Sequence, residues 1–103
     1  MNFNEYQSCA LKTANETSAL TNWALGLCGE TGEVAEIIKK NAFHGHELDR
    51  KALCNELGDA LWYLAVMADG LGFDLDWIAQ QNVAKLKARY PDGFSEERSQ
   101  NRD

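Results

Sequence analysis

Four carboxylates stand out in this sequence because they form two pairs with the same spacing. Glu30 and Glu33 are three residues apart, and so are Glu56 and Asp59. Residues i and i+3 of a helix share one face, so each pair would project together. If both pairs met, like charges about 4 Å apart would repel by about 4 kcal/mol at an effective dielectric of about 20. A divalent cation resolves that conflict, and oxygen ligands without Cys or His favour Mg²⁺, with Mn²⁺ as a substitute, over zinc.

The positions of these acids break the usual pattern of an amphipathic helix. At about 100° per residue, Glu30 falls inside the apolar stripe of a helix predicted over 19–42, and Glu33 lies at its edge. The centre of that stripe is formed by Leu20, Leu27, Val34 and Ile38. In a helix predicted over 49–71, Glu56 and Asp59 lie on one flank of the core face, with Tyr63 beside them. That core face is formed by Leu53, Leu57, Leu61, Leu64 and Ala68.

The elements that must position these acids are four helices, and no strand is predicted. The first helix starts at the N-cap Asn2, with Glu5 completing a capping box, and runs to about Asn15, where a polar patch over 15–18 follows. Asp49 is expected to cap the third helix, and Gly72 to follow its C-terminal end. The fourth helix covers 74–90, with Asp74 as its cap and Pro91 as its stop. Residues 1–94 are therefore predicted to form one all-α domain, followed by a polar tail over 95–103 that we expect to fray.

The fourth helix carries groups that suit phosphate. Asn82 and Arg89 share a face with Ile78 and Leu86, and Lys85 lies alongside. Long cations can extend from an apolar face for structural reasons alone. If they face a carboxylate-bound metal, they could instead bind the phosphates that the metal bridges.

Glycines and aromatic residues mark the same region. Gly26, Gly29, Gly32 and Gly58 lie inside predicted helices, where each costs up to about 1 kcal/mol relative to alanine. Either another helix or a ligand is expected to approach there, with core packing as the simpler alternative. A nucleotide base could stack on Trp23, on Trp62 or on the 43–46 loop, although Trp23 also fits the core. We assign no metal role to the loop histidines His44 and His46.

Composition restricts the possible partners. The chain has 103 residues, 45% of them hydrophobic and 25% charged, which suits one globular domain. A net charge of -6 disfavours nucleic-acid binding through a basic face. The longest uncharged apolar run, 60–68, is too short to span a bilayer, so no membrane partner is expected. Three cysteines without a Cys-x-x-Cys pair, and a start without a signal-peptide pattern, predict buried reduced thiols in a cytoplasmic protein.

Residues 60–68 are apolar on nearly every face of their predicted helix. Trp62 and Val66 lie opposite the core leucines. Because one small domain can cover only one face, the opposite face is expected to contact a second subunit.

Together, the two acid pairs and their flanking segments resemble the Glu-x-x-Glu … Glu-x-x-Asp signature of the MazG-type nucleotide pyrophosphohydrolases. The matching segments are LGLCGETGEVAE at 25–36, ELGDALWYL at 56–64 and NVAKLKARYPDGF at 82–94. The resemblance implies a four-helix MazG-like bundle completed by dimerisation, in an all-α superfamily that includes phosphoribosyl-ATP pyrophosphohydrolase and the dimeric dUTPases. It also implies cleavage of nucleoside triphosphates to monophosphate and pyrophosphate.

The resemblance also assigns roles by position. It makes Mg²⁺ ligands of the four acids, and places Lys85 and Arg89 on the triphosphate with Asn82 and Tyr63 as further polar contacts. Glu33 becomes the candidate to orient or deprotonate the attacking water, although Glu30 or Glu56 could serve equally. The implied assembly is a homodimer or homotetramer. The ligand set consists of Glu30, Glu33, Glu56 and Asp59.

Two other classes compete with this interpretation. A non-catalytic helical interaction module would keep the apolar interface but would not need paired acids. A di-iron carboxylate bundle places Glu-x-x-His on two of its helices, and this chain has no such pair.

Overall fold

The computed structural model describes residues 1–15 and 20–102, and over these ranges the chain contains helices and no strand. The all-α prediction is confirmed. The predicted start of the second helix at Ala19, and the polar patch at 16–18, lie outside the described residues. The helices are α1 (Phe3–Leu11), α2 (Leu20–Phe43), α3 (Arg50–Gly70), α4 (Leu75–Arg89) and α5 (Glu96–Gln100).

Most helix ends follow the predicted capping residues. The Asn2 side chain accepts a hydrogen bond from the Glu5 backbone N–H at 2.8 Å, and Asp49 accepts one from that of Ala52 at 2.9 Å. After α3, Gly72 takes a φ of +82°, a conformation that favours glycine. The first helix ends at Leu11 rather than near Asn15. The Thr13 backbone N–H and hydroxyl both donate to the Ala10 carbonyl, which closes a tighter turn there.

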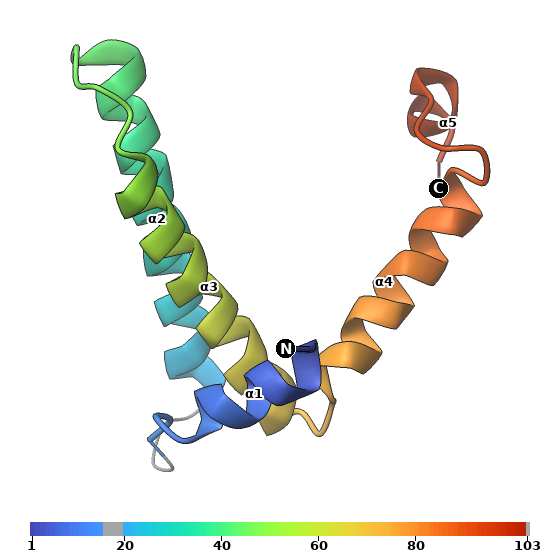
Figure 1. The fold of residues 1–103 in the computed structure, drawn as a ribbon. Coiled ribbons are helices and arrows are strands. Elements are labelled where there is room, and N and C mark those ends of the chain that lie inside the picture. Colours follow the sequence, from blue (N-terminus) through green and yellow to red (C-terminus); the bar gives the residue numbers. More distant parts are fainter. Residues whose placement is uncertain (16–19, 103) are drawn as a thin grey trace.

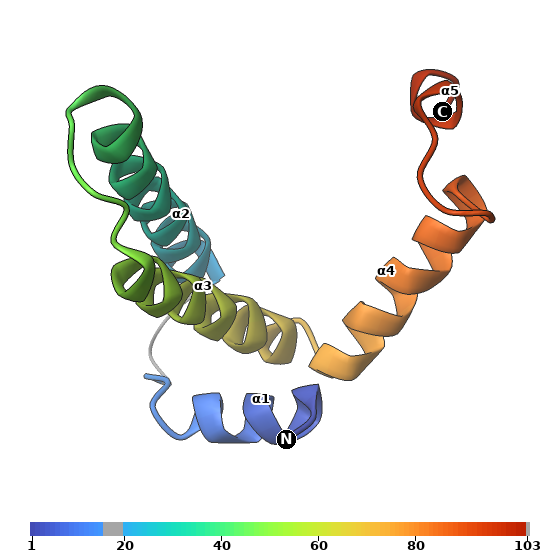
Figure 2. The ribbon, with the colours of Figure 1, turned by 45° about the horizontal axis from the view of Figure 1, so that its top comes forward.

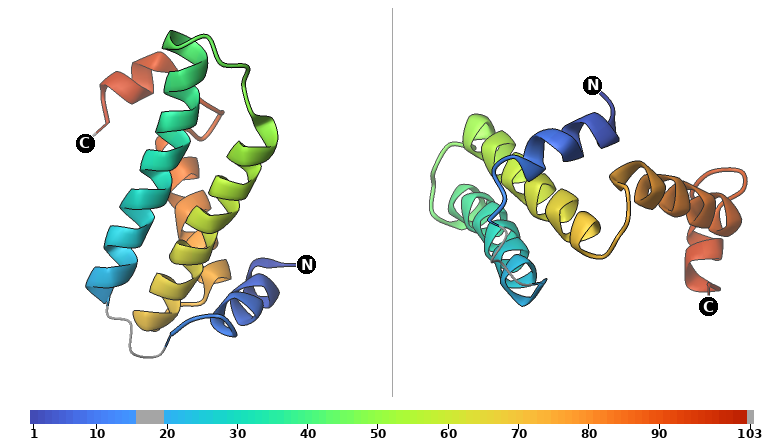
Figure 3. Two further views of the ribbon diagram at one scale, coloured as in Figure 1. Left: turned by 90° about the vertical axis from the view of Figure 1, so that its left-hand side faces the viewer. Right: turned by 90° about the horizontal axis from the view of Figure 1, so that it is seen from below.

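The helices form two arms that diverge from a common vertex (Figures 1 and 2). In one arm α2 and α3 lie side by side, while α4 leads away in the other arm and α5 lies at its far end. Seen from below, α1 lies beside α3 near the start of α4 (Figure 3). The radius of gyration is 16.7 Å, whereas a compact domain of about 100 residues has about 13 Å. One chain therefore does not close the predicted four-helix bundle by itself.

The core is small and lies at this vertex. Its buried residues come from three helices, namely Ala10, Ala65, Ala68 and Leu75. Tyr6, Leu61 and Trp62 pack against them and are partly buried. Apolar burial thus fixes α1 to α3 and to the first turn of α4, and leaves the rest of α4 uncovered.

One polar side chain joins the three helices at the vertex. The buried Gln7 amide donates hydrogen bonds to the carbonyls of Ala65 and Phe73, each at 3.1 Å. Its oxygen accepts one from the Leu75 N–H at 3.0 Å. Asp74 occupies the predicted N-cap position of α4, but its side chain makes no capping hydrogen bond. The prediction was wrong in that respect, because a residue from α1 reaches the free N–H group instead.

The predicted core face of α3 was wrong in part, although Ala68 is buried and Leu61 packs against the core as expected. Leu57 and Leu64, expected in the core, are 59% and 46% exposed, whereas Val66, expected to face a partner, is 1% exposed. The Trp62 indole N–H donates to the carbonyl of Ala10 and to the hydroxyl of Thr13. The face opposite the leucines is therefore covered by α1 of the same chain. Periodicity showed that residues 60–68 are apolar on nearly every face of the helix, but it could not show against which face α1 would pack.

Several other expected burials do not occur in the single chain. The apolar stripe of α2 contains no buried residue, and Leu20 and Ile38 are 44% and 48% exposed. The predicted buried thiols are wrong, because Cys9, Cys28 and Cys54 are free and exposed. In the described part of the chain α2 packs mainly against α3, which leaves the other side of α2 uncovered.

The polar tail forms α5 rather than fraying. The Ser95 side chain caps this short helix by accepting a hydrogen bond from the Arg98 N–H at 3.1 Å. Although α2 and α3 contain 24 and 21 residues, no described helix is both long and apolar enough to cross a membrane.

Candidate metal centre

The register between α2 and α3 is set by aromatic rings that lie directly on glycine backbones. A Cβ atom added to Gly26 would overlap the ring of Tyr63, and one added to Gly70 would meet the ring of Trp23 at 2.5 Å. Residues early in α2 thus lie against residues late in α3, so the two helices run antiparallel. This register brings the middle of α2 opposite the first half of α3.

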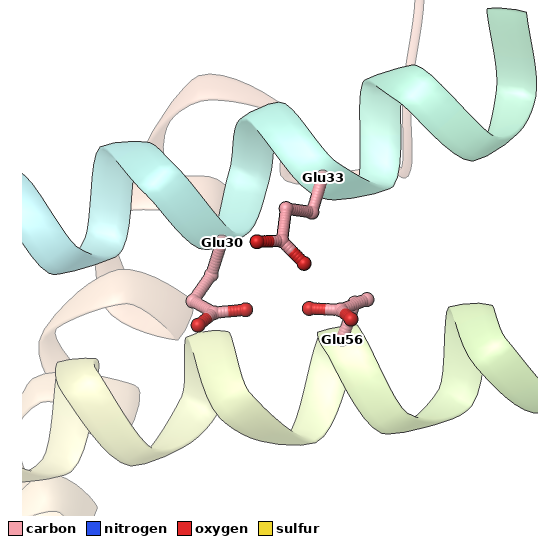
Figure 4. A group of neighbouring side chains, drawn as sticks. All are labelled: Glu30, Glu33 and Glu56. Atoms are coloured by element: carbon pink, nitrogen blue, oxygen red, sulfur yellow. The ribbon is translucent and has the colours of Figure 1, made fainter.

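Three of the four predicted acids meet at that point. Glu30 and Glu33 from α2 and Glu56 from α3 each offer one oxygen, and these oxygens lie within 4.8 Å of one another. Figure 4 shows the three carboxylates pointing toward one another across the gap between the helices. Among the described residues, this is the one group of such side chains that could hold a metal ion.

The fourth acid, Asp59, lies beside this cluster rather than inside it. It lines a pocket of about 260 Å³ together with Glu30, Trp62 and Tyr63. The rings of Trp62 and Tyr63 pack edge to face, with centroids 5.0 Å apart. The pocket therefore joins two predicted metal ligands to an aromatic wall, and it contains the predicted polar contact Tyr63.

Mutual repulsion and burial act on the cluster. The negative charge of Glu56 is the main cause that raises the pKa of Glu33 above its ordinary value. The neighbouring carboxyl group of Glu30, followed by burial, raises the pKa of Glu56. The buried Oε2 atoms of Glu30 and Glu56 have no hydrogen-bond partner. In the described part of the chain the ion pair found is Lys39–Glu36, at 3.4 Å, which is not part of this cluster.

These observations fit a hard divalent cation. Mg²⁺–oxygen distances are about 2.1 Å, so opposite ligands of one octahedral ion lie about 4.2 Å apart. The cluster oxygens all lie within 4.8 Å of one another, which is compatible with one such ion. Buried carboxylate oxygens without donors need a cation or a proton, and the set offers oxygen ligands alone. Glu30, Glu33 and Glu56 are thus suited to hold Mg²⁺ or Mn²⁺, with Asp59 close by.

Sequence reasoning missed one residue near this site. Tyr6 of α1 has a raised pKa, first because it is partly buried and then because of the negative charge of Asp59. No sequence motif links the two residues, because Tyr6 reaches this region only through the docking of α1 on α3. Its hydroxyl is therefore a further polar group on the side of the cluster nearest Asp59.

The predicted phosphate-binding groups do not reach the carboxylates within one chain. Asn82, Lys85 and Arg89 all belong to α4, which forms the other arm of the molecule (Figure 1). Asn82 and Lys85 are exposed, and Arg89 is partly buried.

The predicted close approach at the glycines occurs at Gly26 alone. An added Cβ atom at Gly29, Gly32 or Gly58 would have no neighbour within 4 Å. At these three no other described helix approaches, because α2 and α3 meet along the face that carries Gly26, and the predicted approach of a ligand stays a prediction. The space beside them is open to a ligand or to another chain.

Two antiparallel helices bring together glutamates whose buried oxygens have no hydrogen-bond partner. This arrangement defines a class of all-α proteins with a carboxylate cluster suited to a divalent cation. Comparison with known families gives a more specific result, since residues 18–94 match the MazG nucleotide pyrophosphohydrolase domain. The chain belongs to this family. It is also 32% identical over 114 residues to "Gene 37 protein" of Mycobacterium phage L5, which covers 99% of this chain and 100% of that protein. No solved structure matches significantly.

Proposed function

We propose that this protein is a Mg²⁺-dependent nucleoside triphosphate pyrophosphohydrolase. Water adds to a phosphorus of the triphosphate, an anhydride P–O bond breaks, and the products are a nucleoside monophosphate and pyrophosphate. The observation that carries this proposal is the carboxylate cluster, whose three oxygens lie within 4.8 Å of one another and whose charge no described cation balances. Membership of the MazG family supports the reaction class.

The cluster would divide its tasks among its members. All four acids would hold Mg²⁺, which when bound neutralises charge on the phosphate oxygens. Glu33 would also orient and deprotonate the attacking water. Exposure favours Glu33 for this role, because water can reach its carboxylate directly. Tyr63 and Trp62 would contact the nucleoside from the adjoining pocket.

A second chain is needed to complete this site. Asn82, Lys85 and Arg89 can reach a triphosphate bound at a carboxylate cluster only if α4 packs against the α2–α3 arm of another copy. Both surfaces are apolar and uncovered, since α3 exposes Leu57 and Leu64, and α4 exposes a further set. That set consists of Trp77 at 50%, Ile78 at 40%, Val83 at 48% and Leu86 at 44%. We therefore propose that the protein forms a homodimer or homotetramer. We also propose that it acts in the cytoplasm, without nucleic-acid or membrane partners.

The proposal is tested by pyrophosphate release from the common ribo- and deoxyribonucleoside triphosphates with Mg²⁺. Wild type should release pyrophosphate, and Glu56→Gln should not. Glu36→Gln is the matched control, because Glu36 lies on α2 in a surface ion pair outside the cluster. Mg²⁺ together with a non-hydrolysable triphosphate should raise the melting temperature of wild type, because a ligand that binds the folded state stabilises it. If neither release nor stabilisation occurs, the protein is a non-catalytic helical interaction module of the same fold.

A further inference from the structure

A second charged site lies at the far end of the other arm. Arg89, the last residue of α4, lines a pocket of about 410 Å³ together with residues of α5 and the chain just after it. The other lining residues are Ala88, Arg98, Asn101 and Arg102. Three arginines thus line one pocket in a chain whose net charge is -6. Arg98 and Arg102 lie outside the segment that matches the MazG domain.

The turn between α4 and α5 is built by specific contacts. Gly93 takes a φ of +90°, and its N–H donates to the carbonyl of Tyr90 at 3.0 Å. The rings of Tyr90 and Phe94 pack with centroids 5.3 Å apart. The Ser95 cap then starts α5. These contacts bring Arg98 back toward Arg89, so the pocket is a product of the fold and not of a random tail.

The described part of the chain places three positive charges at this pocket and no negative one. Among the residues that the structure describes, no carboxylate lines it and none of its three arginines forms an ion pair. The acids of α5, Glu96 and Glu97, are not among the lining residues. Like charges that converge in this way repel one another unless an anion lies between them. Planar guanidinium groups with several N–H donors match phosphate oxygens particularly well.

We propose that the pocket formed by Arg89, Arg98 and Arg102 binds a chain of two or three phosphates. Three cations around one pocket suit an anion with several negative charges better than a single carboxylate. If the proposed function holds, this pocket grips the phosphate chain of the substrate, and the segment after residue 94 supplies two of the cations. Binding of the anion itself does not depend on that function, since it needs no metal.

The test is calorimetric titration of the full chain with inorganic tripolyphosphate in the presence of a chelator. Without metal, the carboxylate cluster repels the anion and does not contribute. Wild type should bind, and the double variant Arg98→Ala/Arg102→Ala should bind at least about tenfold more weakly. Lys87→Ala is the matched control, because Lys87 lies on the same arm but does not line the pocket, and its affinity should stay unchanged. Both arginines are exposed, so the double variant should melt like wild type.

Two results would overturn the proposal, namely no binding by wild type or equal binding by wild type and the double variant. A metal-free competition identifies the source of the phosphates. Displacement of tripolyphosphate by a non-hydrolysable nucleoside triphosphate supports the nucleotide, and displacement by pyrophosphate alone supports a free inorganic anion. Failure of the proposed hydrolysis can be distinguished from failure of the pocket, because a chain that does not hydrolyse nucleotides would still bind tripolyphosphate. Conversely, hydrolysis by a chain that does not bind metal-free tripolyphosphate would refute only the pocket.

Discussion

The side chain of Gln7 caps the helix that begins at Leu75, with its Oε1 atom 3.0 Å from the Leu75 backbone nitrogen. The same amide donates to two carbonyls, one in α3 and one in the turn before α4. Asn4 adds a second contact by accepting a hydrogen bond from the Asp76 N–H at 3.1 Å. One face of α1 thus determines the direction in which α4 leaves the vertex. The angle between the two arms depends on this link.

Replacement of Gln7 by alanine should destabilise the protein. The change leaves buried N–H and C=O groups without partners, which costs about 1–3 kcal/mol. Chemical denaturation of the variant should show a lower free energy of unfolding. Ser8→Ala is the control, because Ser8 is the next residue and is exposed. Equal stability of the two variants would show that Gln7 does not hold the vertex together.

Alanine at two glycines of α2 should have opposite effects. Gly26→Ala should destabilise the fold, because the new methyl group overlaps the ring of Tyr63 and forces α2 away from α3. In Gly29→Ala the new methyl group has no neighbouring atom within 4 Å. This variant should therefore stabilise the helix by up to about 1 kcal/mol. Thermal melting of metal-free protein measures both. Destabilisation by Gly29→Ala would instead reveal another chain packed against that position.

Mg²⁺ should stabilise the protein more at neutral than at acidic pH. The pKa values of Glu33 and Glu56 are raised in the folded chain from an ordinary value of 4.5. The folded state therefore holds these protons more tightly than the unfolded state. The stability that the two groups contribute is present below pH 4.5 and is lost as pH rises through the raised pKa values. Metal ions need the deprotonated carboxylates, so they restore that stability at higher pH.

Melting temperatures with and without Mg²⁺, at about pH 5 and about pH 7.5, measure this effect. Glu56→Gln removes one of the repelling charges, so the metal-free variant should be more stable than wild type at the higher pH. It should also respond less to Mg²⁺. A Mg²⁺ effect that is equal at both pH values would contradict the proposed ligand set.

Glu33→Gln should lower kcat for pyrophosphate release by about 10²–10⁴-fold, the usual contribution of a general base. The amide keeps the shape of the side chain but cannot accept a proton, and it also binds a cation less well. Activity measured over a range of Mg²⁺ concentrations separates these two effects. If saturating Mg²⁺ restores full activity, then Glu33 acts as a ligand and another group activates the water.

Leu64→Glu should dissociate the proposed oligomer. Leu64 is 46% exposed on the α3 face that α1 does not cover, so a charge there prevents apolar contact with another copy. Sedimentation measurements should give a smaller species than wild type, and activity should fall because α4 of the partner is lost. Lys51→Glu is a suitable control, since Lys51 is an exposed charged residue at the start of the same helix. A monomeric wild type would refute the requirement for a second chain.

The sequence by itself determined the helices and the acids that could share a cation. Capping residues such as Asn2 and Asp49 act within a single turn, so their effects are local and can be identified without tertiary structure. The spacing of Glu30 and Glu33 on one helix face follows from helical geometry alone. The two acid pairs also predicted a cation site, because like charges that gather in one place repel one another.

Only the tertiary structure decided which faces are covered. Apolar residues lie on nearly every face of the second half of α3, so periodicity could not distinguish Val66, which is buried, from Leu64, which stays exposed. The link between Gln7 and Leu75, and the return of Arg98 to Arg89, join residues through backbone turns whose direction depends on many contacts together. Packing between elements is a non-local property of the chain. For that reason the local pattern predicted the helices but not the two arms.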